Sequence, residues 1–289
     1  MVSVTSIFQN IVSGLNTSAL LMVAALGLVI IFGLMGVINM AHGELMMVGA
    51  YVTYYTTYVL HIPFLFALIF AFLVTGLIGS LIEMLIIKSL YSKPTETLLA
   101  TFAVSLVLER VVYLIFGADT KNVPMPIPGN ITIAGITIPN YNVFAIAFGI
   151  LILLLTVFIF QKTSFGKKMR ATTQNRSMAE CLGIKTSRVD TWTFAYGSGL
   201  AGIAGALIAP TISVSTGMGS PYLTESFMTV VVGGVQSVIG TAFGAGIVGE
   251  ARTIIGGLSS AVTAKILVFL IIIVLIRIKP QGLFAKERR

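Results

Sequence analysis

The feature that most constrains this chain is a series of long apolar runs that carry almost no charge. The segments "FAIAFGILILLLTVFIF" (144–160) and "ILVFLIIIVLIRI" (266–278) are two of them. Charged residues make up 10% of the chain, against about 25% in soluble domains, and the mean hydropathy is +1.00. A water-soluble fold could not bury this much apolar surface. Because the runs are continuous, unlike the short alternating strands of a membrane β-barrel, they predict an all-α, polytopic helical bundle in a membrane.

The number of crossings follows from the thickness of the bilayer. A hydrocarbon core of about 30 Å is spanned by about 20 apolar helical residues. A further stretch, 222–257, is apolar but rich in glycine, and we expect either one long broken segment or two short ones there. With it the bundle has about eight or nine transmembrane segments, and the whole chain, 1–289, forms one transmembrane domain. The other expected spans lie near residues 15–36, 45–60, 64–87, 97–117, 142–161, 190–210 and 261–278.

The basic residues are concentrated in two short stretches. Residues 162–190 hold seven of the eighteen Lys and Arg, and residues 277–289 hold five more. The positive-inside rule places both stretches in the cytoplasm, which also makes a nucleic-acid partner a poor explanation of their charge. Alternation of nine crossings then places the N-terminus outside. We therefore expect 162–190 to be a cytoplasmic loop and 118–140 to be an external loop, with a β-hairpin in "NITIAGITIP".

Local signals indicate ordered structure in the cytoplasmic loop. The segment "NRSMAECLG" (175–183) is typical of a two-turn helix that Asn175 caps and Gly183 ends. In "SRVD", Ser187 with Asp190 three residues later matches a capping box at the start of the next span. The alternative is a disordered basic linker.

The most unusual stretch is "GLMGVINMAHGELMMVGAYV" (33–52), which places Asn39, His42 and Glu44 among glycines inside an apolar segment. Its first eleven residues agree at five positions with "GVQSVIGTAFG" (234–244). Many transporters contain internal repeats with broken helices at corresponding positions, where irregular backbone lines the substrate path. We therefore predict two internal repeats, each with a broken helix. The alternative for the glycines is a tight crossing of helices.

The two predicted breaks supply candidate pathway residues. Asn39 and His42 come from the first break, and Gln236 and Ser237 come from the second. Glu44 is interpreted as a gate or as one member of a structural pair.

Other ionisable residues in apolar segments are interpreted as structural. Because charges are costly in the bilayer, we expect each of these residues to form a structural pair rather than to contact substrate. They are Glu83, Lys88, Glu109, Arg110, Glu225, Glu250, Arg252 and Lys265.

Signals for catalysis are absent from the sequence. No GxxxxGK[ST], HExxH or GxSxG motif occurs, and two histidines with the one cysteine, Cys181, do not make an ordinary zinc site. The chain is therefore predicted not to be an enzyme and to bind no cofactor or metal. A passive channel remains possible on physical grounds, but a structured basic loop favours a subunit that docks on a separate motor.

These segments resemble a known family. The stretch 33–52, the loop "GKKMRATTQNRSMAECLGIKTSRVD" (166–190) and "GSGLAGIAGAL" (197–207) are similar to the permease subunits of bacterial branched-chain amino acid and urea ABC importers. The resemblance runs from about residue 15 to the end. Segments such as "ETLLAT" (96–101) and "YLTESFMTVVVGGV" (222–235) look most like the urea-type first permease. Gln236 departs from the family pattern, in which a third glycine is expected there.

The resemblance implies a larger machine in the bacterial inner membrane. A second permease would pair with this chain, two cytoplasmic ATPases would bind ATP and Mg²⁺, and a periplasmic or cell-surface solute-binding protein would deliver the cargo. By the same resemblance, Met178 and Leu182 would anchor a short helix in a groove of the ATPase, with Arg176 and Lys185 as charges at the rim. The alternative is that this helix lies on the membrane surface.

The resemblance also implies the cargo. The expected substrate is urea or a similar small amide, for which a few polar groups in an apolar channel suffice. Import of branched-chain amino acids by the same architecture is one alternative, and a zwitterion would favour paired charges or helix dipoles along the path. A passive urea or small-solute channel is the other alternative.

Overall fold

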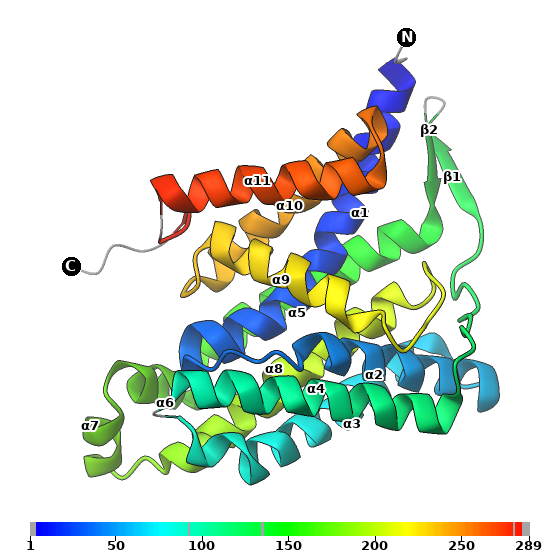
Figure 1. The fold of residues 1–289 in the computed structure, drawn as a ribbon. Coiled ribbons are helices and arrows are strands. Elements are labelled where there is room, and N and C mark those ends of the chain that lie inside the picture. The colour runs from blue at the N-terminus through cyan, green and yellow to red at the C-terminus, as the bar shows by residue number, and fades with distance from the viewer. Residues whose placement is uncertain (1–3, 92, 134–135, 280, 285–289) are drawn as a thin grey trace.

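The computed structural model describes residues 4–91, 93–133, 136–279 and 281–284, and it is a helical bundle with one small hairpin (Figure 1). Among these residues the expected all-α architecture is confirmed, apart from the hairpin. The elements in chain order are α1 (Val4–Leu28), the π-helical turn η1 (Val29–Leu34), α2 (His42–Tyr54), η2 (Tyr55–Val59), α3 (Phe64–Leu85), the 3₁₀ turn η3 (Ile87–Ser89), α4 (Pro94–Phe116), β1 (Asn130–Ile133), β2 (Ile136–Pro139), α5 (Asn140–Lys162), α6 (Ser164–Gln174), α7 (Arg176–Cys181), α8 (Thr186–Ile208), α9 (Gly219–Gly233), α10 (Val238–Leu258) and α11 (Ala261–Ile278).

The predicted spans correspond to helices of the structure. The glycine-rich stretch 222–257 forms two helices, α9 with 15 residues and α10 with 21. A 15-residue helix is only about 22 Å long, which is shorter than a bilayer core. The total of eight or nine crossings stays a prediction. Five helical stretches of the described residues are long and apolar enough to cross a membrane by length and composition: Gln9–Leu34, Phe64–Ser89, Pro94–Phe116, Asn140–Lys162 and Val238–Leu258.

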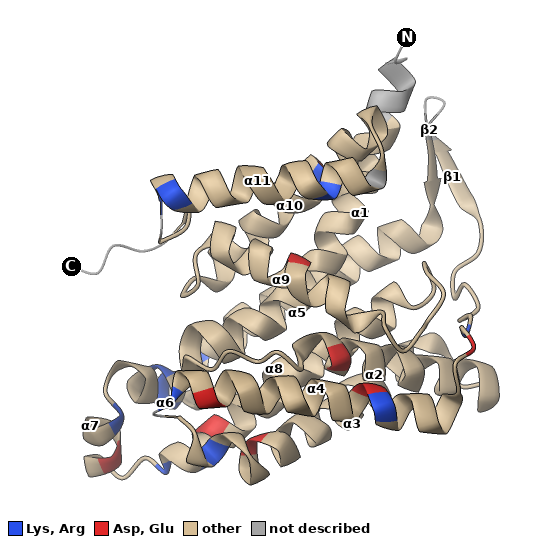
Figure 2. Ribbon diagram, in the orientation of Figure 1, with Lys and Arg blue, Asp and Glu red and all other residues tan. Residues whose placement is uncertain are grey.

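The bundle has two distinct ends. The antiparallel hairpin of β1 and β2 lies at one end, which we call the hairpin end, and its turn at 134–135 lies outside the described residues. The helices α6 and α7 lie at the opposite end, which we call the α7 end (Figure 1). Blue segments gather around α6 and α7 in Figure 2. The described residues of the two predicted loops therefore lie at opposite ends of the bundle. That the α7 end faces the cytoplasm stays a prediction.

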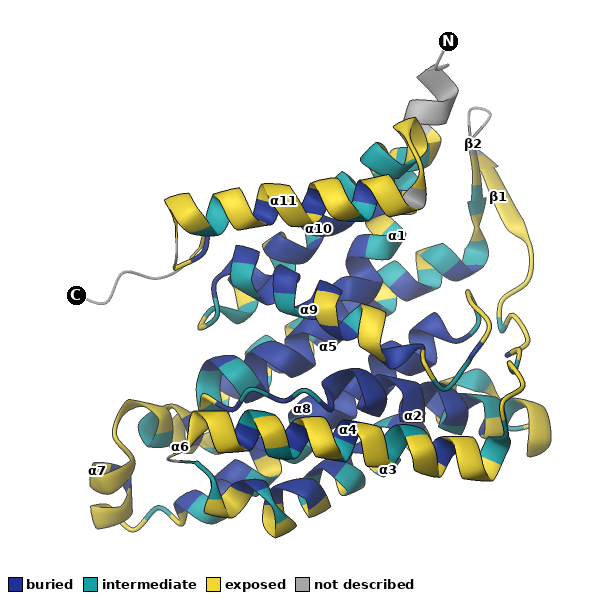
Figure 3. Ribbon diagram, in the orientation of Figure 1, coloured by how far each residue is buried: buried dark blue, intermediate teal, exposed yellow. Residues whose placement is uncertain are grey.

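Helix α8 occupies the centre of the bundle. Every residue from 197 to 208 is buried, and α1, α2 and α3 pack against this helix (Figure 3). The approach is close because both partners carry glycine: a methyl group on Gly49 of α2 would overlap the backbone of Gly202. Here the glycines serve a tight helix crossing, which was the alternative interpretation. Large apolar side chains on α3, α4 and α11 are exposed and are suited to contact lipid.

Both predicted helix breaks are present. The first helix passes through η1, becomes irregular from Gly36 to Ala41 and resumes as α2. We call residues 29–41, which comprise η1 and this irregular segment, the first break. Gly36 has a φ of +71°, a backbone conformation that glycine adopts readily. At the second break, α9 ends at Gly233, and Gly234 has a φ of +99° before α10 begins. That the two breaks belong to internal repeats stays a prediction.

Candidate functional site

The polar residues of the first break are buried and hold the break in place. Asn39 and His42 have no exposed surface. The Asn39 side-chain oxygen accepts a hydrogen bond from the Ala41 amide at 3.0 Å, which is the local bonding typical of an Asx turn. The His42 Nε2 atom lies 3.0 Å from the carbonyl oxygen of Ala24 on α1. Asn39 therefore satisfies a backbone group of the break, whereas His42 ties the start of α2 to α1. Their predicted place on a pathway stays a prediction.

A threonine of α4 also supports the first break. The Thr101 hydroxyl accepts a hydrogen bond from the Met40 amide and donates one to the Ile38 carbonyl, each at 3.1 Å. It thereby satisfies a donor and an acceptor that the interrupted helix leaves free. This role of Thr101 was not predicted, because a threonine within an apolar helix carries no signal of it.

Glu44 lies in the first turn of α2, where the helix dipole favours a negative charge. Its side chain is buried, and within the described part of the chain it forms no ion pair. Its predicted role as a gate or as part of a structural pair stays a prediction.

The second break meets the first at the α7 end. A methyl group on Gly33 would overlap the carbonyl oxygen of Val235, so the two breaks are in direct contact. Ser237 caps α10 by accepting a hydrogen bond from the Gly240 amide at 2.9 Å, whereas the Gln236 side chain is exposed. A cavity of about 260 Å³ lies at this junction. Its lining includes Gly36, Tyr91, Thr173, Arg176, Asp190 and Gln236. Asn39, His42 and Ser237 do not line it.

The helices α6 and α7 form an ordered element at this cavity. As predicted, Asn175 caps α7 by accepting from the Met178 amide at 3.0 Å, and Gly183 follows the helix with a φ of +81°. Helix α6 was not predicted. Its Thr173 hydroxyl donates to the Leu34 carbonyl at 2.8 Å, so α6 is bonded to the first break.

Arg176 does more than supply a charge at the rim of α7, because its side chain joins α7 to α8. We call its contacts the Arg176 clamp. Its Nη2 atom lies 2.7 Å from Oδ2 of Asp190 on α8, and its Nε atom lies 3.5 Å from Oε1 of Glu180. The guanidinium also lies over the Tyr91 ring, 5.1 Å from the centroid. The predicted capping box is therefore wrong: α8 begins at Thr186 without a side-chain cap, and the Asp190 carboxylate pairs with Arg176 instead.

A buried carboxylate extends this clamp to α3. Glu83 is fully buried and accepts hydrogen bonds from the Tyr91 hydroxyl at 2.7 Å and the Thr191 hydroxyl at 2.6 Å. Burial, together with the nearby negative charge of Asp190, raises the pKa of Tyr91 above its usual range, so the phenol stays protonated and can donate. Helices α3, α7 and α8 are thus joined by one polar network, which we call the α7-end network: Glu83, Tyr91, Arg176, Glu180, Asp190 and Thr191.

The proposed ATPase anchors are exposed on this end. Met178 is 58% exposed and Leu182 is 74% exposed, one helical turn apart. Lys185, which follows them, is also exposed. Two large apolar side chains beside a basic residue on a membrane-end helix suit a protein partner, and their role in coupling stays a prediction.

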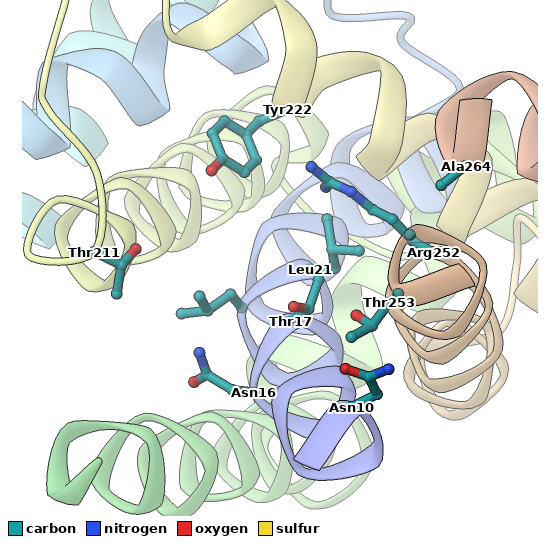
Figure 4. Close-up of a pocket in the computed structure, with 12 residues that line it drawn as sticks. Asn10, Asn16, Thr17, Leu21, Thr211, Tyr222, Arg252, Thr253 and Ala264 are labelled. Carbon is teal, nitrogen blue, oxygen red and sulfur yellow. The ribbon is translucent and has the colours of Figure 1, made fainter. Parts of the chain in front are cut away.

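A second polar cavity lies at the hairpin end, between α1, α9, α10 and α11 (Figure 4). Its volume is about 440 Å³. Arg252 lines it and pairs with Glu225 of α9, whose other oxygen lies 3.4 Å from Nζ of Lys265 on α11. The expected pairing is confirmed for these three residues, whereas neither carboxylate oxygen of Glu250 has a hydrogen-bond partner among the described residues. In the described residues no group of three or more His, Cys, Asp or Glu side chains is placed to hold a metal ion.

Comparison with known proteins gives one consistent result. Residues 10–276 match the family model described as "Branched-chain amino acid transport system / permease component". The chain is 25% identical over 294 residues to the high-affinity branched-chain amino acid transport system permease protein BraD of Pseudomonas aeruginosa, covering 96% of this chain and 95% of the relative. It is 26% identical over 307 residues to the corresponding protein LivH of Escherichia coli, with the same coverage.

An archaeal relative and the solved structures complete the comparison. The chain is 27% identical over 286 residues to the probable branched-chain amino acid transport permease protein LivH of Methanocaldococcus jannaschii, which covers 92% of this chain and 89% of the relative. No solved structure matches the chain.

Proposed function

The chain belongs to the family of branched-chain amino acid transport permeases, and on this premise we propose that it forms, with a second permease, the membrane path of an ATP-driven importer for branched-chain amino acids. The relatives named above are transport permeases and not enzymes. ATP would be bound and hydrolysed, with Mg²⁺, by two partner ATPases at the α7 end. A solute-binding protein would deliver the cargo at the hairpin end. In bacteria the assembly would lie in the inner membrane.

The cargo proposal departs from the urea interpretation of the sequence. The names of the relatives from Pseudomonas, Escherichia and Methanocaldococcus all specify branched-chain amino acids. Arg252, which lines a polar cavity, also suits an amino acid better than neutral urea, because a guanidinium can pair with a carboxylate.

The observation that carries the mechanism is the bonded connection from α6 and α7 to both helix breaks. Arg176 links α7 to α8, and Thr173 links α6 to the first break at Leu34. The first break contacts the second at Gly33 and Val235. A displacement of α6 and α7 by a docked ATPase is therefore passed to the cavity where the two breaks meet. Packed elements of this kind shift together rather than deform individually.

Uptake by cells or proteoliposomes with the complete transporter tests the function. We expect ATP-dependent uptake of labelled leucine that is lost when this chain is deleted and when the partner ATPases are inactivated. Uptake of urea alone would return the cargo to the urea interpretation. Leucine uptake that persists without ATPase activity would instead identify a passive channel.

The docking proposal is tested by replacing Met178 and Leu182 with Asp. Buried apolar anchors dominate the energy of such interfaces, so the double variant should lose co-purification of the ATPases while it still inserts into the membrane. Met125→Asp is the matched control, because Met125 is 46% exposed at the hairpin end. Retention of the ATPases by the double variant would show that they dock elsewhere.

A further inference from the structure

The hairpin-end cavity has a chemical lining that neither the family nor the relatives' names assign to a role. It combines one guanidinium, several neutral oxygens and an apolar wall within about 440 Å³, a volume in the range of about 300–1,000 Å³ that small-molecule sites occupy. We infer that this cavity binds the zwitterion of an aliphatic amino acid, with the carboxylate at Arg252 and the ammonium group at Asn16. The inference rests on the proposed function and assigns that function's cargo to a site within this chain.

The charge of the cluster supports the carboxylate assignment. Arg252 and Lys265 share the single carboxylate of Glu225, so the cluster has one positive charge without a partner. Glu225 is 6% exposed in its side chain, whereas Arg252 is 38% exposed and lines the cavity. Glu250 lies two residues before Arg252, but it contacts Gly14 and does not line the cavity. A ligand carboxylate can therefore complete the coordination of Arg252.

The opposite wall offers acceptors for an ammonium group. The Asn16 side-chain oxygen is buried and has no hydrogen-bond partner among the described residues. Figure 4 shows Asn16 on α1 and Arg252 on α10 on different sides of the cavity, with Tyr222 of α9 above Asn16 and its hydroxyl pointing away from Arg252. A buried acceptor without a partner costs free energy, so a donor that reaches it binds favourably.

The remaining wall fits an aliphatic side chain. Leu20 and Leu21 of α1 and Ala264 of α11 line the cavity beside these polar groups. Guanidinium, acceptor and apolar wall thus correspond to the three parts of leucine, isoleucine or valine. Urea has no group for the apolar wall and no charge for Arg252.

The test is equilibrium binding of radiolabelled L-leucine to the purified complex of two permeases and two ATPases, without the solute-binding protein. We expect saturable binding. Leucinol, which lacks the carboxylate, and 4-methylpentanoate, which lacks the ammonium group, should each compete at least about tenfold more weakly than leucine.

Variants then locate the site. Arg252→Gln should weaken leucine binding by about tenfold to a hundredfold, because it removes a charge-assisted contact. Asn16→Ala leaves the ion cluster intact and should weaken binding by about three- to tenfold. Arg110→Gln is the matched control, since Arg110 is an exposed arginine of α4 that does not line the cavity, and it should bind as the wild type does.

Two results would overturn the inference while leaving the proposed function intact. One is ATP-driven leucine uptake by the complete transporter with no leucine binding to the isolated complex. The other is wild-type binding by both Arg252→Gln and Asn16→Ala; if Arg252→Gln does not assemble, Asn16→Ala and the competitors decide alone. Failure of the complete wild-type transporter to take up leucine would overturn the function itself.

Discussion

Two arginine–carboxylate pairs lie at opposite ends of the bundle, and they have the same chemistry in different surroundings. At the α7 end, Arg176 pairs with Asp190 and Glu180 and lies over the Tyr91 ring. At the hairpin end, Arg252 shares Glu225 with Lys265 and faces a cavity. Acids outnumber cations in the first cluster, and cations outnumber acids in the second.

The difference separates a structural ion pair from a recognition group. The Arg176 guanidinium meets three protein groups, two carboxylates and the Tyr91 ring, and these contacts hold α7 against α8. Arg252 keeps part of its hydrogen-bonding capacity free in a cavity, so a ligand can use it. The comparison therefore predicts that changes at the α7 end act on stability and coupling, and that changes at the hairpin end act on binding.

The largest effect is expected from Arg176→Gln. Asp190 is only 7% exposed in its side chain and would be left as a buried carboxylate without its cation. Breaking a fully buried pair costs about 3–5 kcal/mol, and because Arg176 is 43% exposed we expect about 2–3 kcal/mol here. Thermal unfolding of the complex in detergent measures this, and proteolysis should begin within 164–181. Arg188→Gln is the control, because Arg188 is exposed nearby, and a similar loss in both variants would argue against the clamp.

Tyr91→Phe should cost less, about 1–2 kcal/mol, because one oxygen of the buried Glu83 loses its donor. The stability of the wild-type protein should also fall as the pH rises. The pKa of Tyr91 is raised in the folded state, so its contribution is complete below the unfolded value of about 10 and is lost as the pH rises above it. Melting temperatures at pH 8 and pH 10.5 should therefore differ less in Tyr91→Phe than in the wild type. Tyr58→Phe, at an exposed tyrosine, should leave this difference unchanged.

The sequence predicted the parts of this molecule that local physics determines. Apolar run lengths indicated the helices, and the glycine-rich stretches 33–43 and 234–244 indicated both breaks, where Gly36 and Gly234 adopt positive φ angles. The cap at Asn175 indicated where α7 begins, because its side chain bonds an amide within the first turn of that helix. The hairpin at 130–139 followed from two short β-prone runs on either side of Ala134-Gly135.

The sequence did not predict contacts that depend on tertiary packing. The spacing of Ser187 and Asp190 fits a capping box, but an ion pair with Arg176 takes the carboxylate away from the helix end. Thr101 meets the first break 61 residues away in sequence, at Met40, and no local pattern reveals this. The hairpin-end cavity likewise gathers Asn16, Tyr222 and Arg252 from three helices, so its lining exists only in the folded chain.

Lysine substitutions sharpen the comparison between the two arginines. Arg176 uses two nitrogens on two carboxylates and stacks on a ring, a geometry that an ammonium group cannot reproduce. Arg252 makes one contact with Glu225, through Nη1, which lysine can replace. We expect Arg176→Lys to lower the unfolding free energy by about 1 kcal/mol more than Arg252→Lys does. Thermal unfolding of the two variants in the same detergent measures the difference, and equal losses would mean that both arginines serve only as point charges.

The smallest stability effect is expected from Lys265→Gln. The Lys265 side chain is 43% exposed, and partly exposed pairs contribute less than about 1 kcal/mol. This change nevertheless leaves Arg252 alone with Glu225 and removes the surplus positive charge beside the cavity. Leucine affinity of the isolated complex should fall several-fold although the melting temperature changes little. Lys93→Gln, at an exposed pair with Glu96 on α4, should change neither quantity. A large loss of stability without loss of affinity in Lys265→Gln would make the hairpin-end cluster a structural pair like the one at the α7 end.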